Sequence, residues 1–440
     1  MARRKERYIL QTDNTVINGY EQAGTLENWR DKVSKPCAGN HRIVFGISAS
    51  FAAPLLHQLD QQGFGVNFKG ASSIGKTTVL RAAKSVMGDH AHIRTWRATA
   101  SGLESVAAQH NDNVLFLDEM GEADPKEIGA TAYMLANGQG KLRQTRSITL
   151  RQSLTWRLIY LSTGEVSLAD MLAQAKQKLK AGQAVRVIDI SADAKQGLGI
   201  FDRLPDGFSN GAEFADYLKD RTKQYHGVAF VDYMTSLTSD LKANVQKVRD
   251  WRTQWREAYL PSGADSQVKR VADSFATIAA GGELATDMNI TGWGEGDAGA
   301  SAAVCFNAWL HQRGSIGNQE ETDILRAFHA HFEEHGAAKY AYVELRPQDD
   351  KTVYRMGYRD NAGDFFVLPS RFEEELCKAN GFDKEQVIDV LIRHKYLIKG
   401  GDGRATITKR VYSLDLESST EERKPVRVYH LSAAIVGGAE

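Results

Sequence analysis

Short apolar runs alternate with helix-spaced apolar residues through residues 40–280. Runs of this length are typical of buried strands. Between them, apolar residues recur every three or four positions, which predicts helices. Strands that alternate with helices indicate an α/β fold built on a parallel sheet. The predicted strands are 66–68, 114–117, 156–161 and 184–190, and the predicted helices are 40–61, 79–87, 101–109, 168–179, 212–224, 236–259 and 267–280.

The pattern changes after Asn318, where the segments become shorter. A glycine-rich stretch, 281–299, precedes the change and is interpreted as a connection. Two adjacent helices followed by a two-stranded ribbon predict a winged-helix module with basic residues around the ribbon. Such modules bind either duplex DNA or a protein, and the sequence leaves both open. The predicted segments are helices 322–334, 370–380 and 384–394, and strands 341–345, 352–358, 406–412 and 426–431.

The first predicted strand leads into a full match to the pattern G-x-x-x-x-G-K-[ST]. Glycines let the backbone wrap round a phosphate chain, and the N–H groups at the following helix start point at the anion. In this pattern Lys76 reaches the terminal phosphates and the Thr77 hydroxyl sits on Mg²⁺. We therefore expect a site for ATP with Mg²⁺. The expected binding residues are Gly70, Ala71, Ser72, Ser73, Ile74, Gly75, Lys76, Thr77 and Thr78.

Acidic and hydroxyl residues follow the next two predicted strands. Asp118 and Glu119 end the run 114–117, at the point where a parallel strand delivers side chains to a crevice. Asp118 is expected to hold Mg²⁺ through water, and Glu119 to orient or deprotonate the attacking water. Ser162 and Thr163 end the run 156–161, where a hydroxyl can position the same water.

Two basic features stand apart from this predicted site. Residues 128–164 contain no acid, and 138–151 alternate as strands do, which predicts a basic hairpin. The hairpin either contacts a nucleic-acid backbone or is a solvated surface. Arg186 interrupts the apolar run 184–190, so it either forms a local salt bridge or meets the γ-phosphate held by a neighbouring subunit.

Composition is that of an ordinary globular protein of 440 residues, 42% hydrophobic and 25% charged, with a formal net charge of zero. Any nucleic-acid role must therefore come from local patches. Cys37, Cys305 and Cys377 lie far apart without metal-binding spacing, which fits a reducing cytoplasm. The sequence has no apolar run long enough to predict a membrane span.

With these elements placed, the chain resembles the AAA+ ATPases. More narrowly, it is similar to an uncharacterised-domain family found in replication proteins of prophages and integrated mobile elements, whose members are similar to minichromosome-maintenance (MCM) helicases. The resemblance runs from about Asn40 to Ala280 and more weakly through the C-terminal part. It rests on the strings GASSIGKTT, LFLDEM, NGQGKLR, TWRLIYLSTGE and GQAVRVIDI.

The resemblance implies roles for further residues. Thr163, or Ser162, matches the first sensor, where many relatives carry asparagine. Arg186 falls at the arginine finger that acts on the adjacent subunit's ATP, and Arg270 at the second sensor on a lid helix. The 138–151 segment corresponds to a pre-sensor hairpin that lines a central channel. Its expected DNA contacts are Lys141, Arg143 and Arg146.

The resemblance also implies the domain organisation and the activity. We expect a ring, with six subunits as the expected number, that hydrolyses ATP between subunits and translocates on single-stranded or forked DNA as a helicase. Relatives often carry a primase-like region, so a primase or another replication protein is an expected partner. The alternatives are an AAA+ loader that remodels a protein and a module that binds nucleotide without hydrolysis. The expected segments are an N-terminal extension (1–39), an ATPase core with the hairpin and a helical insertion (40–260), a helical lid (261–318) and a winged-helix domain (319–440).

Overall fold

The computed structural model describes residues 19–141, 143–144, 150–151, 153–314, 316–346, 352, 354–414 and 421–437. The chain divides into two compact units, Met1–Ile316 and Gly317–Glu440. Each unit has its own hydrophobic core, so each is described by itself.

A five-stranded sheet organises the first unit, with the strand order β2-β3-β6-β1-β7. Neighbouring strands are parallel throughout. The sequence therefore predicted the α/β class correctly, and the parallel sheet is confirmed. The strands are β1 (Phe64–Lys69), β2 (Arg94–Thr95), β3 (Asn113–Asp118), β6 (Leu158–Gly164) and β7 (Val187–Ser191).

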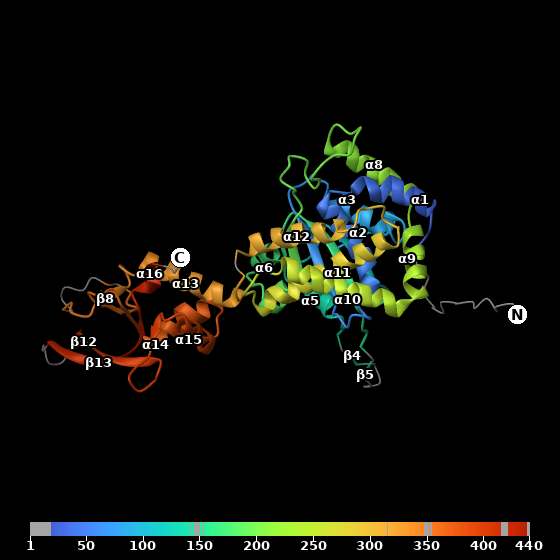
Figure 1. Ribbon diagram of the computed structural model, residues 1–440. Helices are drawn as coiled ribbons and strands as arrows, with labels where there is room; N and C mark the ends of the chain where they lie inside the picture. Colours follow the sequence, from blue (N-terminus) through green and yellow to red (C-terminus); the bar gives the residue numbers. More distant parts are fainter. Residues whose placement is uncertain are drawn as a thin grey trace. The chain divides into compact units, whose positions relative to one another are not determined.

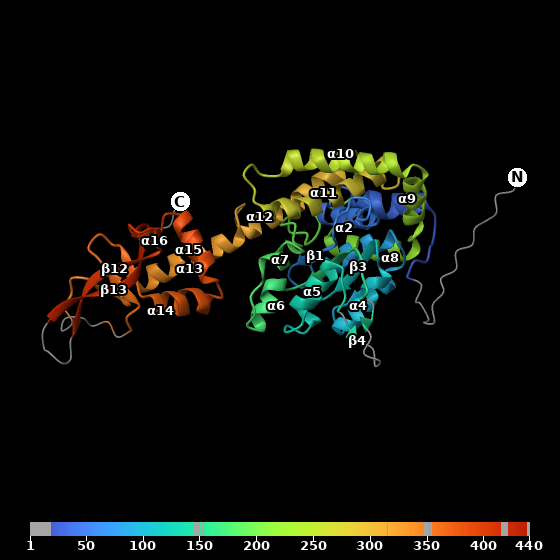
Figure 2. The same ribbon diagram turned by 90° about the horizontal axis from the view of Figure 1, so that it is seen from below.

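Helices cover both faces of this sheet, as a parallel sheet requires. Successive residues of β6 point to opposite faces: Ile159 and Leu161 belong to one core cluster, and Leu158 and Tyr160 to another. Figure 2 shows α10, α11 and α2 on one side of the strands and α5 and α6 on the other. The covering helices are α2 (His41–Ala52), α3 (Lys76–Ser85), α10 (Leu241–Tyr259), α11 (Ser266–Asp287) and α12 (Asp297–Arg313) on the first face, and α4 (Ala100–Gln109), α5 (Ile128–Asn137) and α6 (Leu168–Gln174) on the second.

The predicted break after residue 280 is wrong, because α11 continues to Asp287. Gly281 and Gly282 lie inside this helix, where a Cβ on Gly281 would come within 2.7 Å of the Ala52 backbone. The two glycines let α11 pack closely against α2, so they serve helix packing and not a connection. The predicted helix 236–259 is also divided, because α9 (Val228–Ser239) ends before Asp240 caps α10.

The 138–151 hairpin is present between α5 and β6. Its strands β4 (Arg143–Gln144) and β5 (Leu150–Arg151) pair in antiparallel fashion. At the base of the hairpin, the Gly140 amide donates to the Leu154 carbonyl at 2.8 Å, which continues the antiparallel pairing towards the sheet. Figure 1 shows β4 and β5 projecting from one end of the first unit.

A six-stranded sheet and several helices form the second unit. The sheet has the order β11-β13-β10-β9-β8, and β12 also pairs with β13. Phe332, Phe365 and Phe372 lie in the core between the sheet and the helices. The strands are β8 (Tyr340–Tyr342), β9 (Gly357–Arg359), β10 (Phe365–Val367), β11 (Leu397–Ile398), β12 (Thr406–Leu414) and β13 (Glu421–Leu431), and the main helices are α13 (Gln319–His335), the helical stretch from Pro369 to Asn380 that includes α14 (Pro369–Arg371), and α15 (Lys384–Arg393).

The short strand β10 had not been predicted from the sequence. It joins β9 to β13, and all three of its residues are buried. Among the described residues, no helix is both long and apolar enough to cross a membrane.

Candidate functional site

The loop between β1 and α3 enters the helix through a glycine in the left-handed conformation. Gly75 has φ of 91°, in the left-handed region, and directly precedes the first residue of α3. A Cβ there would lie 2.9 Å from Ile200 Cγ2, so glycine is required both by the backbone angle and by the packing. The Ile200 amide also donates to the Ile74 carbonyl at 2.8 Å, and this hydrogen bond ties the loop to the segment that follows β7.

Lys76 lies at the start of α3 and is 6% exposed. Its ammonium donates to the carbonyls of Gly70 at 3.0 Å and Ala71 at 2.7 Å. An ammonium has three donors, so one remains for an anion at the mouth of the loop. The positive charge faces two neutral carbonyls and has no carboxylate partner among the described residues. This is a suitable arrangement for a phosphate group.

Asp118 connects the loop to the neighbouring strands. The Thr77 hydroxyl donates to its Oδ2 at 3.2 Å, and the Thr163 hydroxyl donates to its Oδ1. The carboxyl ends of β1, β3 and β6 meet at this edge of the sheet because the three strands are adjacent and parallel. The structure thus brings together Lys76, Thr77, Asp118 and Thr163.

Glu119 is held in an unusual backbone conformation, with φ of 55° and ψ of 71°. A residue other than glycine in the left-handed region carries strain, and such residues cluster at functional sites. The Glu119 amide donates to Asp118 Oδ1 at 3.2 Å and to Thr163 Oγ1 at 3.4 Å. Burial, together with the Asp118 carboxylate, raises the pKa of Glu119, and Lys76 acts in the opposite direction. A raised pKa suits a carboxylate that accepts a proton near neutral pH.

Ser162 and Thr163 point to opposite faces of β6. The Ser162 hydroxyl accepts a hydrogen bond from Trp96 Nε1 at 2.8 Å inside the core. Of the two candidate hydroxyls, Thr163 is therefore the one that lies beside Asp118.

The oxygen ligands at this edge fit Mg²⁺. Thr77 and Asp118 place a hydroxyl and a carboxylate together, and both are hard oxygen donors. Magnesium is usually held by one or two protein carboxylates plus substrate phosphates and water. Two protein ligands next to a phosphate loop match that requirement.

A second cavity of about 240 Å³ lies at the opposite end of the strands, where β1 begins. Gly63 and Phe64 line it, whereas the phosphate loop follows the last residue of the same strand. A strand of six residues spans about 17 to 20 Å, so the two sites are far apart within one chain. The cavity is also lined by three arginines: Arg186, Arg252 and Arg270.

Arg186 lies just before β7 and not inside it, which corrects the predicted strand 184–190. The preceding residues form the short helix α7 (Ala181–Ala184) instead. Arg186 Nη1 donates to the Gly182 carbonyl at 3.0 Å, and its guanidinium lies 5.2 Å from the centre of the Tyr133 ring. Within the part of the chain that the structure describes, Arg186 forms no ion pair. The local salt bridge considered from the sequence is therefore not found in that part.

Arg252 is the residue of this cavity that sequence reasoning missed. It lies on α10, its Nη2 donates to Gln61 Oε1 at 3.0 Å, and its Nε is buried without a hydrogen-bond partner. Burial lowers the pKa of Arg252, and nearby Asp273 acts against this. Asp273 also pairs with Arg256 at 3.1 Å, so its charge is shared. No local motif marks Arg252, because only tertiary packing brings α10 to the start of β1.

Arg270 and the hairpin residues lie away from the phosphate loop. Arg270 is exposed on α11, at the rim of the arginine cavity. Lys141 is exposed at the base of the hairpin. Arg143 belongs to β4, but its side chain is not described, and Arg146 lies outside the described residues.

Comparisons with known proteins give one family match and a likeness of fold. A family model described as "Domain of unknown function (DUF927)" matches residues 1–155. The solved structure named "SCCmec type IV Cch - active helicase" has a TM-score of 0.67 to this chain at 18% sequence identity. The similarity covers 97% of this chain and 75% of that one, so the fold is shared over nearly the whole of this chain and three quarters of the other. No curated protein matches the chain in sequence.

Proposed function

We propose that this protein is a magnesium-dependent ATPase that assembles into a ring and translocates on DNA as an MCM-like replicative helicase of a mobile element or prophage. The phosphate loop with Asp118, Glu119 and Thr163 supports ATP hydrolysis. The fold shared with a structure named as an active helicase supports the class of motor. A ring of six is the expected size.

The residues at the phosphate loop, which we call the near site, have separate proposed roles. Lys76 and the amides of residues 71–77 bind the phosphates. Thr77 and Asp118 would hold Mg²⁺, which when bound would neutralise charge on the phosphates. Glu119 accepts the proton of the attacking water, and Thr163 fixes the Asp118 carboxylate beside it. The buried setting of Lys76 strengthens its attraction for phosphate.

The observation that carries the ring is the position of Arg186 at the far end of β1. An arginine about 17 to 20 Å from the phosphate loop cannot reach a nucleotide bound in its own chain. Its guanidinium makes one carbonyl hydrogen bond and no described ion pair, so it has donors left for an anion. We therefore assign Arg186 to the ATP of an adjacent subunit, with Arg270 at the rim of the same cavity.

A mixing experiment tests this assignment. Lys76→Ala removes the phosphate lysine but leaves Arg186, and Arg186→Ala does the reverse. Each variant alone should lose ATPase activity by roughly 10³-fold or more. Mixed rings should regain activity, because about a quarter of their interfaces pair an intact loop with an intact arginine. No recovery in rings that mass measurements show to be mixed would rule out the arrangement.

The hairpin is the proposed DNA contact. Lys141, Arg143 and Arg146 belong to a segment without acids, and the paired strands β4 and β5 carry it away from the sheet. Replacing the three by alanine should abolish stimulation of the ATPase by DNA and the unwinding of 3′- or 5′-tailed forks. DNA-independent turnover should remain. Unchanged unwinding would instead favour a loader that remodels a protein, and a primase or another replication protein would then be the partner to test.

The domain assignments complete the proposal. We assign 1–39 to an N-terminal extension, 40–260 to the ATPase core and 261–318 to a helical lid. We assign 319–440 to a winged-helix domain, since α13, the 369–380 helical stretch and α15 precede the paired strands β12 and β13. Limited proteolysis with and without ATP checks the lid, which should become protected when nucleotide binds.

A further inference from the structure

The β12–β13 ribbon of the second unit has two chemically different faces. Nine residue pairs join the strands, from Thr406↔Tyr429 to Leu414↔Glu421. Side chains two residues apart along a strand share a face, and directly paired residues share it too. The register therefore assigns each basic residue of the ribbon to one face or the other.

The inner face is filled by contacts within the unit. Val411 and Val428 are buried in a cluster with Phe366, and Ile407 and Val426 pack against it. Lys409, the basic residue of this face on β12, places its ammonium 3.8 Å from the centre of the Phe366 ring and 3.6 Å from Asp360. Lys409 is thus already engaged, and this face serves folding.

The outer face carries arginines on both strands. Arg410 lies on β12 and Arg423 and Arg427 on β13, all exposed, in register with Thr408 and Tyr412. We call these residues, with Thr406 at the start of β12 and Arg404 two residues before it, the arginine face. Neither strand contributes a described acidic side chain to it.

Contacts at the arginine face leave donors available. Arg427 Nε donates to Thr406 Oγ1 at 2.8 Å, which fixes the side chain and leaves its two terminal nitrogens. Arg404 pairs with Asp402 at 3.5 Å, although its side chain is 72% exposed. Arg423 pairs with Glu344 and lies 4.8 Å from the centre of the Tyr412 ring. Arg410 forms no ion pair with any described residue.

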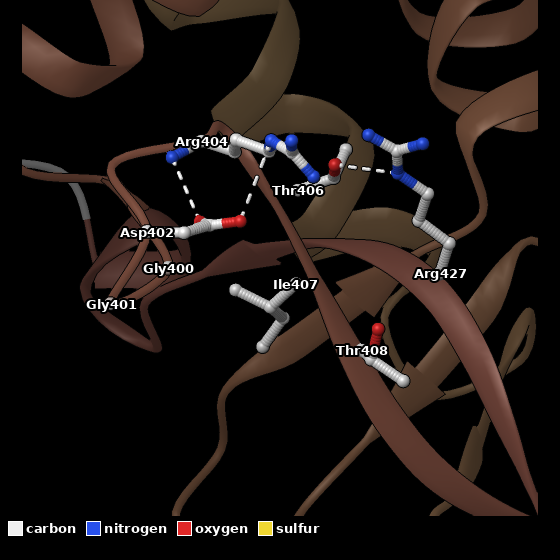
Figure 3. Close-up of a pocket in the computed structure, with 8 residues that line it drawn as sticks. All are labelled: Gly400, Gly401, Asp402, Arg404, Thr406, Ile407, Thr408 and Arg427. Atoms are coloured by element: carbon white, nitrogen blue, oxygen red, sulfur yellow. Dashed lines mark hydrogen bonds and ion pairs between the residues drawn. The ribbon is translucent and has the colours of Figure 1, made fainter.

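Part of the arginine face is hollowed. A cavity of about 370 Å³ is lined by Arg404, Thr406, Ile407, Thr408 and Arg427 together with the turn Gly400–Asp402, whose carboxylate pairs with Arg404. Figure 3 shows the guanidinium groups of Arg404 and Arg427 on either side of Thr406. Asp402 neutralises part of the charge of Arg404, but five guanidinium N–H donors per arginine and two hydroxyls around one hollow still match the several acceptor oxygens of a phosphate group.

We propose that the arginine face binds the phosphate backbone of a nucleic acid. Repeated phosphates need several cations along one surface, and the arginines are spread over both strands for several residues. Residues 415–422 contain four acids in the sequence, so the contacts are assigned to the arginines of the described strands and of the turn near Gly400. The partner is recognised through its backbone and not through base edges.

This surface lies outside the hairpin to which the proposed helicase activity assigns its DNA contacts. The proposal needs neither ATP nor ring assembly. A failure of one proposal therefore leaves the other standing, and separate variants distinguish them.

The test uses the full chain and the triple variant Arg404→Ala, Arg410→Ala and Arg427→Ala. Binding of a duplex and of a single strand is measured by fluorescence anisotropy over a range of salt concentrations. We expect roughly tenfold or greater loss of affinity, and a salt slope smaller by about 2.7 for duplex DNA if all three arginines contact phosphates. ATP binding should stay unchanged. The corresponding Arg→Lys triple keeps the charge and should retain most of the affinity.

The matched control removes the same charge from helices of the same unit: Arg326→Ala, Lys378→Ala and Arg393→Ala. These side chains are 57% to 68% exposed and each pairs with an acid. Affinity and slope should stay close to the wild type. Equal losses in both triples, or no loss in the first, would overturn the proposal. Equal binding of poly-L-glutamate, lost in the first triple, would also overturn it and indicate an acidic protein as the partner.

Discussion

The Thr163 hydroxyl hydrogen-bonds the Asp118 carboxylate across the adjacent strands β6 and β3. The same carboxylate accepts from Thr77 on the other side. Asp118 is thus fixed between the phosphate loop and the fourth strand of the sheet in chain order. The hydrogen bond between Thr163 and Asp118 predicts which substitutions at the phosphate site lower ATP turnover.

Thr163→Val should lower ATP turnover with little effect on ATP affinity. Valine keeps the shape but removes the hydroxyl that orients Asp118 and approaches the Glu119 amide. A fall of about 10²-fold in kcat is expected, the lower end for a positioned catalytic group. Steady-state ATPase rates and nucleotide binding by calorimetry check both parts.

Ser162→Ala is the contrasting variant. It leaves the buried Trp96 Nε1 without its acceptor, which should cost about 1 to 3 kcal/mol of unfolding free energy. The turnover of the folded protein should remain near wild type. If Ser162→Ala lowers kcat as much as Thr163→Val does, the assignment of the sensor to Thr163 is wrong.

Glu119→Gln should retain ATP but lose turnover by about 10²- to 10⁴-fold, because the amide cannot accept the proton. The wild-type protein should also lose activity on acidification, since the role proposed for Glu119 requires the deprotonated carboxylate. Burial and Asp118 raise its pKa, so the acid limb of kcat should lie above the ordinary range of a glutamate. A rate independent of pH from 5 to 8 would contradict this role, and trapped ATP in the variant can be counted by filter binding.

Asp189→Asn should change how stability depends on pH. The Asp189 carboxylate accepts from Asn67 Nδ2 at 2.7 Å and from the Leu168 amide at 3.3 Å, and burial raises its pKa to about 6. The folded state then holds the proton more tightly than the unfolded chain does. The free energy of unfolding should therefore fall as pH rises from about 4 to about 6, by about 1 to 3 kcal/mol.

The Asn variant should lack this fall, and denaturant titrations at several pH values measure it. Asp216→Asn, at an exposed position on α8 (Gly211–Gln224), is the control and should reproduce the wild-type profile. Parallel profiles for wild type and Asp189→Asn would show that Asp189 titrates alike in both states.

Arg252→Ala should reduce ATPase activity in assembled rings, because its buried Nε and the lining position place it beside Arg186. Mixing with Lys76→Ala should restore activity, as expected for a residue that acts on the neighbour's nucleotide. Arg249→Ala is the control: Arg249 lies one turn earlier on α10, is exposed and donates to the Gln58 carbonyl. A role confined to its own subunit predicts no recovery on mixing.

The sequence by itself determined the strand, loop and helix at the phosphate loop and the strand that ends in Asp118, and it predicted the chemistry of these residues. Spacing along the chain predicted the positions of Gly70 to Thr77 and of Asp118 with Glu119. The order of a strand, a glycine loop, a helix start and a second strand end dictates their geometry. The apolar runs likewise indicated the parallel sheet, since buried strands need no polar face.

Only the tertiary structure decided the rest. The choice between Ser162 and Thr163 depends on which face of the sheet each side chain occupies, because neighbouring residues of β6 alternate between faces and the Asp118 carboxylate meets Thr163. Arg252 joins Arg186 only because α10 packs beside the start of β1, and Gly281 and Gly282 lie in a helix because α2 approaches them closely. Such contacts join residues far apart in the chain, so their cause is packing between elements and not the local pattern of either one.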